Sequence, residues 1–112
     1  MELEALRQQA LELADRFDRL NAAQGQQPWG PKDLMLGLSG DVGDLAKAIQ
    51  VAENARTLPG TSIEHELADC LWSLLVLADR YGIDLEQAFT TLVDGMGERV
   101  EAKIAEIESE PS

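Results

Sequence analysis

Apolar residues recur in the first half of the chain at the three- and four-residue spacing of an α-helix, with polar residues between them. This spacing predicts one helix over residues 3–22 and a second from Pro31 to about Asn54. Pro31 suits the first position of a helix, because its missing N–H would have no partner there. The expected core stripes are Leu3, Leu6, Ala10, Leu13, Phe17 and Leu20 in the first helix, and Leu34, Leu38, Val42, Leu45, Ile49 and Ala52 in the second.

A third helix is predicted to follow a loop over residues 56–60. Thr61 and Glu64 have the spacing of a capping box, in which each side chain bonds to the backbone N–H of the other residue. Gly82 fits the stop at the end of this helix, since glycine readily adopts the left-handed conformation common there.

Asp84 is expected to cap a fourth helix, and the tail from about Ser109 is expected to fray. The core stripe of this helix is Leu85, Phe89, Leu92, Met96, Val100 and Ile104. The chain shows no strand alternation, and aromatic residues, which favour strands, make up only 4% of it. The sequence therefore predicts an all-α fold of four helices in a single domain over residues 1–112.

The third predicted helix is apolar around most of its circumference. Its polar residues Glu66, Asp69, Ser73 and Arg80 fall within a wedge of roughly 60°. Three other helices of this size could hardly cover such a helix, so we expect a homo-oligomer, either a dimer or a tetramer, that buries the remaining face. The polar wedge should then face an internal cleft.

Charge and cysteine content narrow the functional classes. Nine basic residues against 21 acidic ones give a net charge of −12, which repels phosphate backbones and anionic lipid. We therefore expect no nucleic-acid or membrane partner. Cys70 is the only cysteine, which excludes an internal disulfide and a cysteine-based zinc site. No apolar signal region or membrane-spanning stretch is seen, so a cytoplasmic location is expected.

Two acidic pairs carry the candidate chemistry. Asp41/Asp44 and Glu66/Asp69 are each spaced three residues apart, which puts both carboxylates of a pair on one helical face. Oxygen ligands without His or Cys favour Mg²⁺, with Mn²⁺ as an alternative, and such a site suits phosphoanhydride hydrolysis. In so acidic a chain, pairs of this kind also arise by chance on solvated faces. Asp69, however, interrupts an apolar run, where an uncompensated charge is costly.

The segments LSGDVGDLA (residues 38–46) and ELADCLWSL (residues 66–74) resemble the MazG-like all-α nucleoside triphosphate pyrophosphohydrolases. The resemblance extends over roughly residues 28–90, and the short layout looks like that of the dCTP pyrophosphatase and integron MazG branches. It implies a four-helix fold completed by oligomerisation, and Mg²⁺-dependent hydrolysis of a (d)NTP to the monophosphate and pyrophosphate.

The same resemblance implies that Asp41, Asp44, Glu66 and Asp69 are metal ligands, with Asp41 or Glu66 orienting or deprotonating the attacking water. Relatives have glutamates in the first pair, so Asp41 and Asp44 are each one methylene shorter. Gly40 and Gly43, which have no side chains, could permit a closer approach of the helices.

Three further residues are candidate substrate contacts. Trp29 could stack on the base or anchor its loop, and Lys47 could meet a phosphate or pair with Asp44. Ser73 stands where several relatives have a substrate-facing tyrosine. Relatives also carry a phosphate-binding Lys and Asn on the last helix, and these positions here hold Leu92 and Met96.

Two other residues receive no functional assignment from the sequence. Trp72 is expected to point away from the acidic wedge, as a core or interface residue. His65, the only histidine, has no evident partner.

Two alternatives to (d)NTP hydrolysis remain open at this stage. One is a catalytically weak or silent oligomer of the same family that binds nucleotide or metal, or that acts as a scaffold. The other is hydrolysis of a different phosphoanhydride, such as phosphoribosyl-ATP, because a metal site does not define the base.

Overall fold

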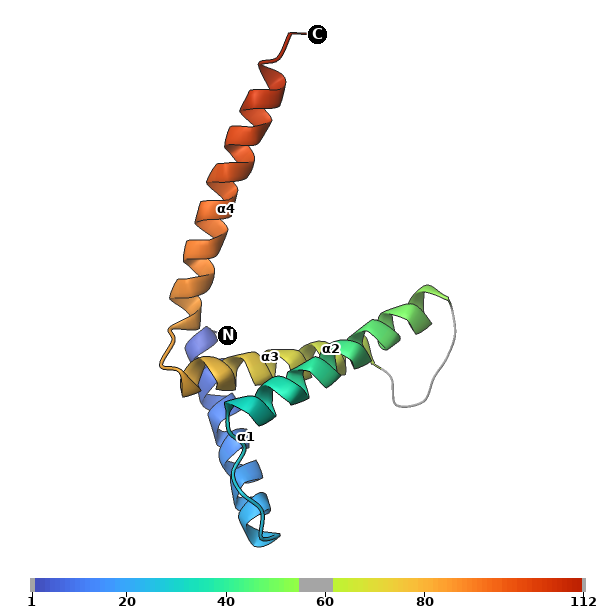
Figure 1. The fold of residues 1–112 in the computed structure, drawn as a ribbon, viewed down its shortest axis with the longest axis vertical. Coiled ribbons are helices and arrows are strands. Elements are labelled where there is room, and N and C mark those ends of the chain that lie inside the picture. Colours follow the sequence, from blue (N-terminus) through green and yellow to red (C-terminus); the bar gives the residue numbers. More distant parts are fainter. Residues whose placement is uncertain (1, 55–61, 112) are drawn as a thin grey trace. The chain divides into compact units, whose positions relative to one another are not determined.

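The computed structural model describes residues 2–54 and 62–111. These residues form four α-helices and no strand, which confirms the all-α prediction (Figure 1). The helices are α1 (Leu3–Ala23), α2 (Pro31–Glu53), α3 (Ile63–Arg80) and α4 (Leu85–Glu108). The predicted loop over residues 56–60 and the predicted capping residue Thr61 lie outside the described residues.

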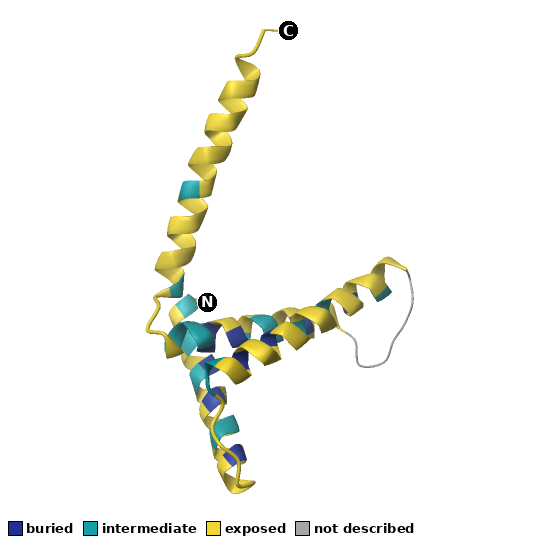
Figure 2. Ribbon diagram, in the orientation of Figure 1, coloured by how far each residue is buried: buried dark blue, intermediate teal, exposed yellow. Residues whose placement is uncertain are grey.

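The chain divides into two compact units, Met1–Gly82 and Ile83–Ser112. In the first unit α2 and α3 lie side by side, and α1 also packs against α3. Figure 2 shows that the buried positions are all on these three helices. The buried apolar residues are Ala10, Ala14, Leu34, Leu38, Ala48, Leu75 and Val76.

Two contacts of α1 with α3 join residues far apart in the sequence. The Arg7 guanidinium lies 2.6 Å from the Asp79 carboxylate. The indole Nε1 of Trp72 donates a hydrogen bond of 3.1 Å to the carbonyl oxygen of Ala10. Because the indole N–H has a fixed direction, this bond restricts the orientation of the Trp72 ring relative to α1.

The predicted core stripe of α2 is wrong at three positions, Val42, Ile49 and Ala52, which are all exposed. Val42 and Ile49 are 52% and 45% exposed, while Asp41 and Leu45 are half-buried and Ala48 is buried. The buried face thus passes through a charged residue in its middle. A carboxylate at that position has to be compensated by its surroundings or by a bound partner.

The helix ends follow local sequence signals. Pro31 begins α2, and Gly82, at φ +64°, follows the end of α3 as predicted. The Asp84 carboxylate caps α4 by accepting the N–H of Gln87 at 3.0 Å. The cap of α3 is Ser62, whose hydroxyl oxygen accepts the N–H of His65 at 3.2 Å, so α3 starts one residue later than the predicted capping box requires.

Helix α4 forms the second unit with short flanking segments and contains no buried residue. Its predicted stripe occurs on a continuous helix, and the larger members from Phe89 to Ile104 are 40–62% exposed. Among the described residues, no helix combines the length and the apolar character needed to cross a bilayer.

Candidate active site

The structure brings the two acidic pairs together across the contact of α2 with α3. Carboxylate oxygens of Asp41, Asp44 and Glu66 all lie within 4.8 Å of one another, and we call these three residues the carboxylate cluster. Asp69 lies one turn beyond Glu66 on α3. It belongs to a second close group with Glu66 and His65, in which the ligand atoms are again within 4.8 Å of one another.

Burial differs among these acids. Glu66 is only 7% exposed, Asp41 is half-buried, and Asp44 is exposed. The pKa of Asp41 is raised above its ordinary value, first because burial disfavours the charged form and then because Asp69 and Asp44 repel it. The cluster therefore concentrates negative charge where a cation would be stabilised.

The cluster offers only carboxylate oxygens, the donors that suit a hard cation such as Mg²⁺. Asp41, Asp44 and Glu66 would hold this ion, so the residues present fit the metal that the sequence implies. The suggested role of Gly40 and Gly43 in close helix approach is not supported, since a Cβ atom built at either position would meet no atom of a neighbouring element within 4 Å among the described residues.

A cavity of about 440 Å³ lies beside the acids, and we call it the aromatic cavity. Its lining combines carboxylates, including those of Asp41 and Asp69, with the flat apolar surfaces of three aromatic rings. Its lining residues are Leu13, Phe17, Trp29, Asp33, Leu34, Gly37, Asp41, Ala68, Asp69, Trp72 and Ser73.

The three rings of this cavity are packed against one another. The ring centroids of Phe17 and Trp29 are 4.9 Å apart, and those of Phe17 and Trp72 are 5.6 Å apart in an edge-on arrangement. Trp72 is a half-buried residue packed between helices, as expected, but it lines the same cavity as Asp69 and Ser73, so the expectation that it points away from the acidic wedge is wrong. Its position three residues after Asp69, on the same helical face, was the signal that could have placed it there.

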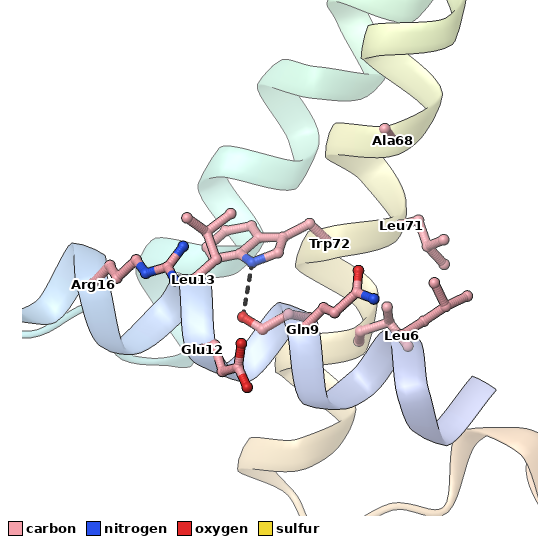
Figure 3. Close-up of a pocket in the computed structure, with 10 residues that line it drawn as sticks. Leu6, Gln9, Glu12, Leu13, Arg16, Ala68, Leu71 and Trp72 are labelled. Atoms are coloured by element: carbon pink, nitrogen blue, oxygen red, sulfur yellow. Dashed lines mark hydrogen bonds between the residues drawn. The ribbon is translucent and has the colours of Figure 1, made fainter. Parts of the chain in front are cut away.

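Trp72 also borders a second hollow, of about 470 Å³, between α1 and α3 (Figure 3). That hollow is lined mainly by aliphatic side chains such as Leu6 and Leu71, with Glu12 and Arg16 among its polar residues. It contains none of the four acids that the sequence singled out. The aromatic cavity is therefore the better candidate for a substrate site.

Two of the three predicted substrate residues line the aromatic cavity. Trp29, 37% exposed, and Ser73, 2% exposed, both line the aromatic cavity. Lys47 is exposed on α2 and does not line this cavity. The sequence suggested no partner for His65, but its Nε2 lies 3.1 Å from an oxygen of Asp69, four residues along α3.

An all-α chain with a carboxylate cluster beside an aromatic cavity has the parts expected of a nucleotide-binding metalloprotein. A sequence model of the MazG nucleotide pyrophosphohydrolase domain matches residues 29–103. The match covers more than half of the chain, and the chain therefore belongs to this family. No curated protein matches it.

Proposed function

We propose that this protein is a Mg²⁺-dependent nucleoside triphosphate pyrophosphohydrolase that converts a (d)NTP and water to the (d)NMP and pyrophosphate. The observation that carries the proposal is the aromatic cavity, which combines Trp29, Phe17 and Trp72 with the carboxylates of Asp41 and Asp69. Flat rings suit a base, and carboxylates that hold a cation suit a triphosphate. Membership of the MazG family supports the same reaction class.

In this proposal the base lies against Trp29 and the triphosphate extends toward the acids. Ser73 offers a buried hydroxyl to the base or sugar. Asp41, Asp44, Glu66 and Asp69 are the metal ligands, and Mn²⁺ is the alternative ion. When bound, such an ion polarises phosphate oxygens and lowers the pKa of a nearby water.

Asp41 or Glu66 orients the attacking water and accepts its proton. The water oxygen forms a bond to the α-phosphorus, while the bond from that phosphorus to the α,β-bridging oxygen breaks. The bridging oxygen leaves with pyrophosphate, so the products balance.

Purified protein should release pyrophosphate from at least one member of a panel of NTPs and dNTPs with Mg²⁺ or Mn²⁺. Glu66→Gln should lower kcat/KM by about 100-fold or more, and Asp69→Ala should abolish release. Glu64→Gln is the matched control, since Glu64 is exposed on the same helical turn and belongs to neither close group. Absence of release across the whole panel would refute the proposal.

A second candidate, nucleotide or metal binding without hydrolysis, is favoured by one observation. None of the residues that line the aromatic cavity is Lys or Arg, so no side chain there neutralises the leaving pyrophosphate. Calorimetry with Mg²⁺ and a non-hydrolysable dNTP analogue separates the two. Binding without product formation in the panel assay supports the second candidate.

We also propose a homo-oligomer and a cytoplasmic location. A homodimer or homotetramer would cover the exposed apolar faces described above, and a cytoplasmic location suits an enzyme acting on free nucleotides. Hydrolysis of a different phosphoanhydride would leave the roles of the acids unchanged and alter only the base contacts. Adding phosphoribosyl-ATP to the substrate panel tests that alternative.

A further inference from the structure

Asp33 lines the aromatic cavity but has no part in the hydrolysis proposed above. It lies in the first turn of α2, and its Oδ2 accepts the backbone N–H of Gly30 at 3.0 Å. This bond holds the carboxylate close to the segment that carries Trp29, the residue before Gly30. The cap needs only one carboxylate oxygen, so Oδ1 remains able to accept a further hydrogen bond.

The wall of the cavity that α2 provides runs from Asp33 to Asp41. Asp33, Gly37 and Asp41 are spaced four residues apart, which puts them on one face of α2, and all three line the cavity. A Cβ atom built at Gly37 would meet no atom of a neighbouring element within 4 Å among the described residues, so the wall is open between the two acids. Eight residues of helix rise about 12 Å, and a nucleotide with its phosphates at Asp41 therefore extends toward Asp33 with its base.

The side chains at the base end of this cavity are better acceptors than donors of hydrogen bonds. None of the lining residues is Lys, Arg, His, Asn or Gln. The indole N–H of Trp72 is already bonded to the carbonyl oxygen of Ala10, and that of Trp29 lies in the plane of its ring, away from a base stacked on the ring face. The Ser73 hydroxyl can donate or accept, whereas the ionised carboxylate of Asp33 can only accept.

We propose that Asp33 determines the base specificity of the cavity by accepting a hydrogen bond from an exocyclic amino group, so that cytosine and adenine are preferred to uracil and hypoxanthine. Each disfavoured base has nearly the shape of its counterpart but carries a carbonyl oxygen in place of the amine. An oxygen opposite an ionised carboxylate leaves two acceptors without a donor. The proposal rests on the proposed function, because it requires a nucleotide with its base against Trp29.

Calorimetry with Mg²⁺ and non-hydrolysable dCTP and dUTP analogues measures this preference without turnover. The wild-type protein should bind the dCTP analogue about tenfold more tightly than the dUTP analogue. The ratio is modest because Asp33 is exposed, so water competes for its oxygen. The corresponding adenine and hypoxanthine analogues should differ in the same direction. Equal affinities within both pairs would overturn the proposal.

Asp33→Asn changes the hydrogen-bonding character of the side chain and keeps its shape. One amide oxygen can still accept the N–H of Gly30, while the amide nitrogen presents donors in place of the second oxygen. The ratio of dCTP to dUTP analogue affinities should therefore fall by about tenfold. An unchanged ratio would mean that Asp33 acts only as the cap of α2.

Asp84→Asn is the matched control for this substitution. Asp84 also caps a helix, by accepting the N–H of Gln87, and it does not line the cavity. The ratio in Asp84→Asn should stay within about threefold of the wild-type value. Far-UV circular dichroism verifies that both variants remain helical, and a ratio that falls equally in both would contradict a role specific to Asp33.

Gly37→Leu tests whether the nucleotide lies along the wall between Asp33 and Asp41. The larger side chain would extend into the open space at Gly37, so both analogues should bind about tenfold more weakly while the ratio of their affinities stays within about threefold. Unchanged affinity for both analogues would mean that the nucleotide lies elsewhere, which overturns the proposal.

Failure of this proposal is distinguishable from failure of the proposed function. A base preference that depends on Asp33, without pyrophosphate release from any nucleotide, would leave the assignment of Asp33 standing and refute hydrolysis. Pyrophosphate release with the same base preference in wild type and Asp33→Asn would refute the assignment of Asp33 alone.

Discussion

Asp41 occupies a position where a carboxylate opposes folding. It sits on the buried face of α2, and Asp69 and Asp44 repel it, as the raised pKa indicates. Residues at functional sites often carry such a stability penalty, because the charge is needed for a ligand and not for the fold. The penalty can be measured by removing the charge while keeping the shape of the side chain.

Asp41→Asn should therefore raise the free energy of unfolding of the metal-free protein by about 0.5 kcal/mol. Excess Mg²⁺ should reverse the order, because a ligand at 100 times its Kd stabilises a protein that binds it by about 2.7 kcal/mol. Urea unfolding in EDTA and in Mg²⁺ provides both measurements. Asp44→Asn is the control, and its effect in EDTA should be smaller since Asp44 is exposed. A less stable Asp41→Asn protein in EDTA would contradict this account.

Trp29 and Trp72 contribute to the aromatic cavity in different ways. Trp29→Ala should weaken binding of a non-hydrolysable dNTP analogue with Mg²⁺ by roughly tenfold, since stacking on an aromatic ring contributes about 1–3 kcal/mol per base.

Trp72→Phe keeps a ring but loses the bond to the carbonyl oxygen of Ala10, so it should lower stability by about 1 kcal/mol. Calorimetry and urea unfolding on both variants separate the effects, and equal nucleotide affinity of wild type and Trp29→Ala would argue against base stacking.

At the scale of the helices, Gly82 ends α3 with a positive φ of 64°. Among the described residues, apart from its two chain neighbours, no atom lies within 4 Å of a Cβ atom built at Gly82, so an alanine there is opposed only by its backbone conformation. Gly82→Ala should lower the free energy of unfolding by about 1 kcal/mol. Gly97→Ala is the matched control inside α4, where a Cβ also meets nothing, and it should increase helix stability by up to about 1 kcal/mol. Thermal unfolding monitored by circular dichroism tests the expected loss of stability in Gly82→Ala and the expected gain in Gly97→Ala.

The sequence predicted the four helices well because their ends depend on local signals such as Pro31, Gly82 and Asp84. The buried face of α2 was predicted less accurately. The pattern of apolar residues placed Val42 on that face, whereas the structure places Asp41 there. A site residue that replaces a core residue removes the very signal on which the prediction depends. The contact of His65 with Asp69 follows from their spacing of four residues on α3, which is a local signal in the sequence.

The aromatic cavity was predictable only in part. Trp29 and Ser73 were selected by the resemblance to the family, and both line the cavity. Phe17 could not be found in the same way, because its spacing on α1 is equally typical of a core residue. Which ring faces the acids depends on how α1 packs against α3, and periodicity within one helix contains no information on that packing.

At the scale of the whole molecule, the main feature left to explain is the exposure of many large apolar side chains to solvent. On α3, Leu67, Leu71 and Leu74 follow helical spacing and are 53%, 40% and 46% exposed. Contiguous exposed apolar residues of this kind mark an association surface, and this face belongs to the helix that the sequence predicted to need an oligomer. A second copy of the chain is the expected occupant, since the same face on two chains is self-complementary about a two-fold axis.

Sedimentation equilibrium at micromolar concentration should therefore give two or four times the chain mass of 12.2 kDa. Leu71→Lys introduces charge into this face and should shift the protein toward the monomer, whereas Glu64→Gln, outside the face on the same helix, should not. Neither substitution changes a proposed metal ligand, so Mg²⁺ affinity reports whether α2 and α3 remain correctly packed. A wild-type chain that sediments as a monomer would mean that its exposed leucines are not covered by another copy, and that Asp41 and Glu66 function within a single chain.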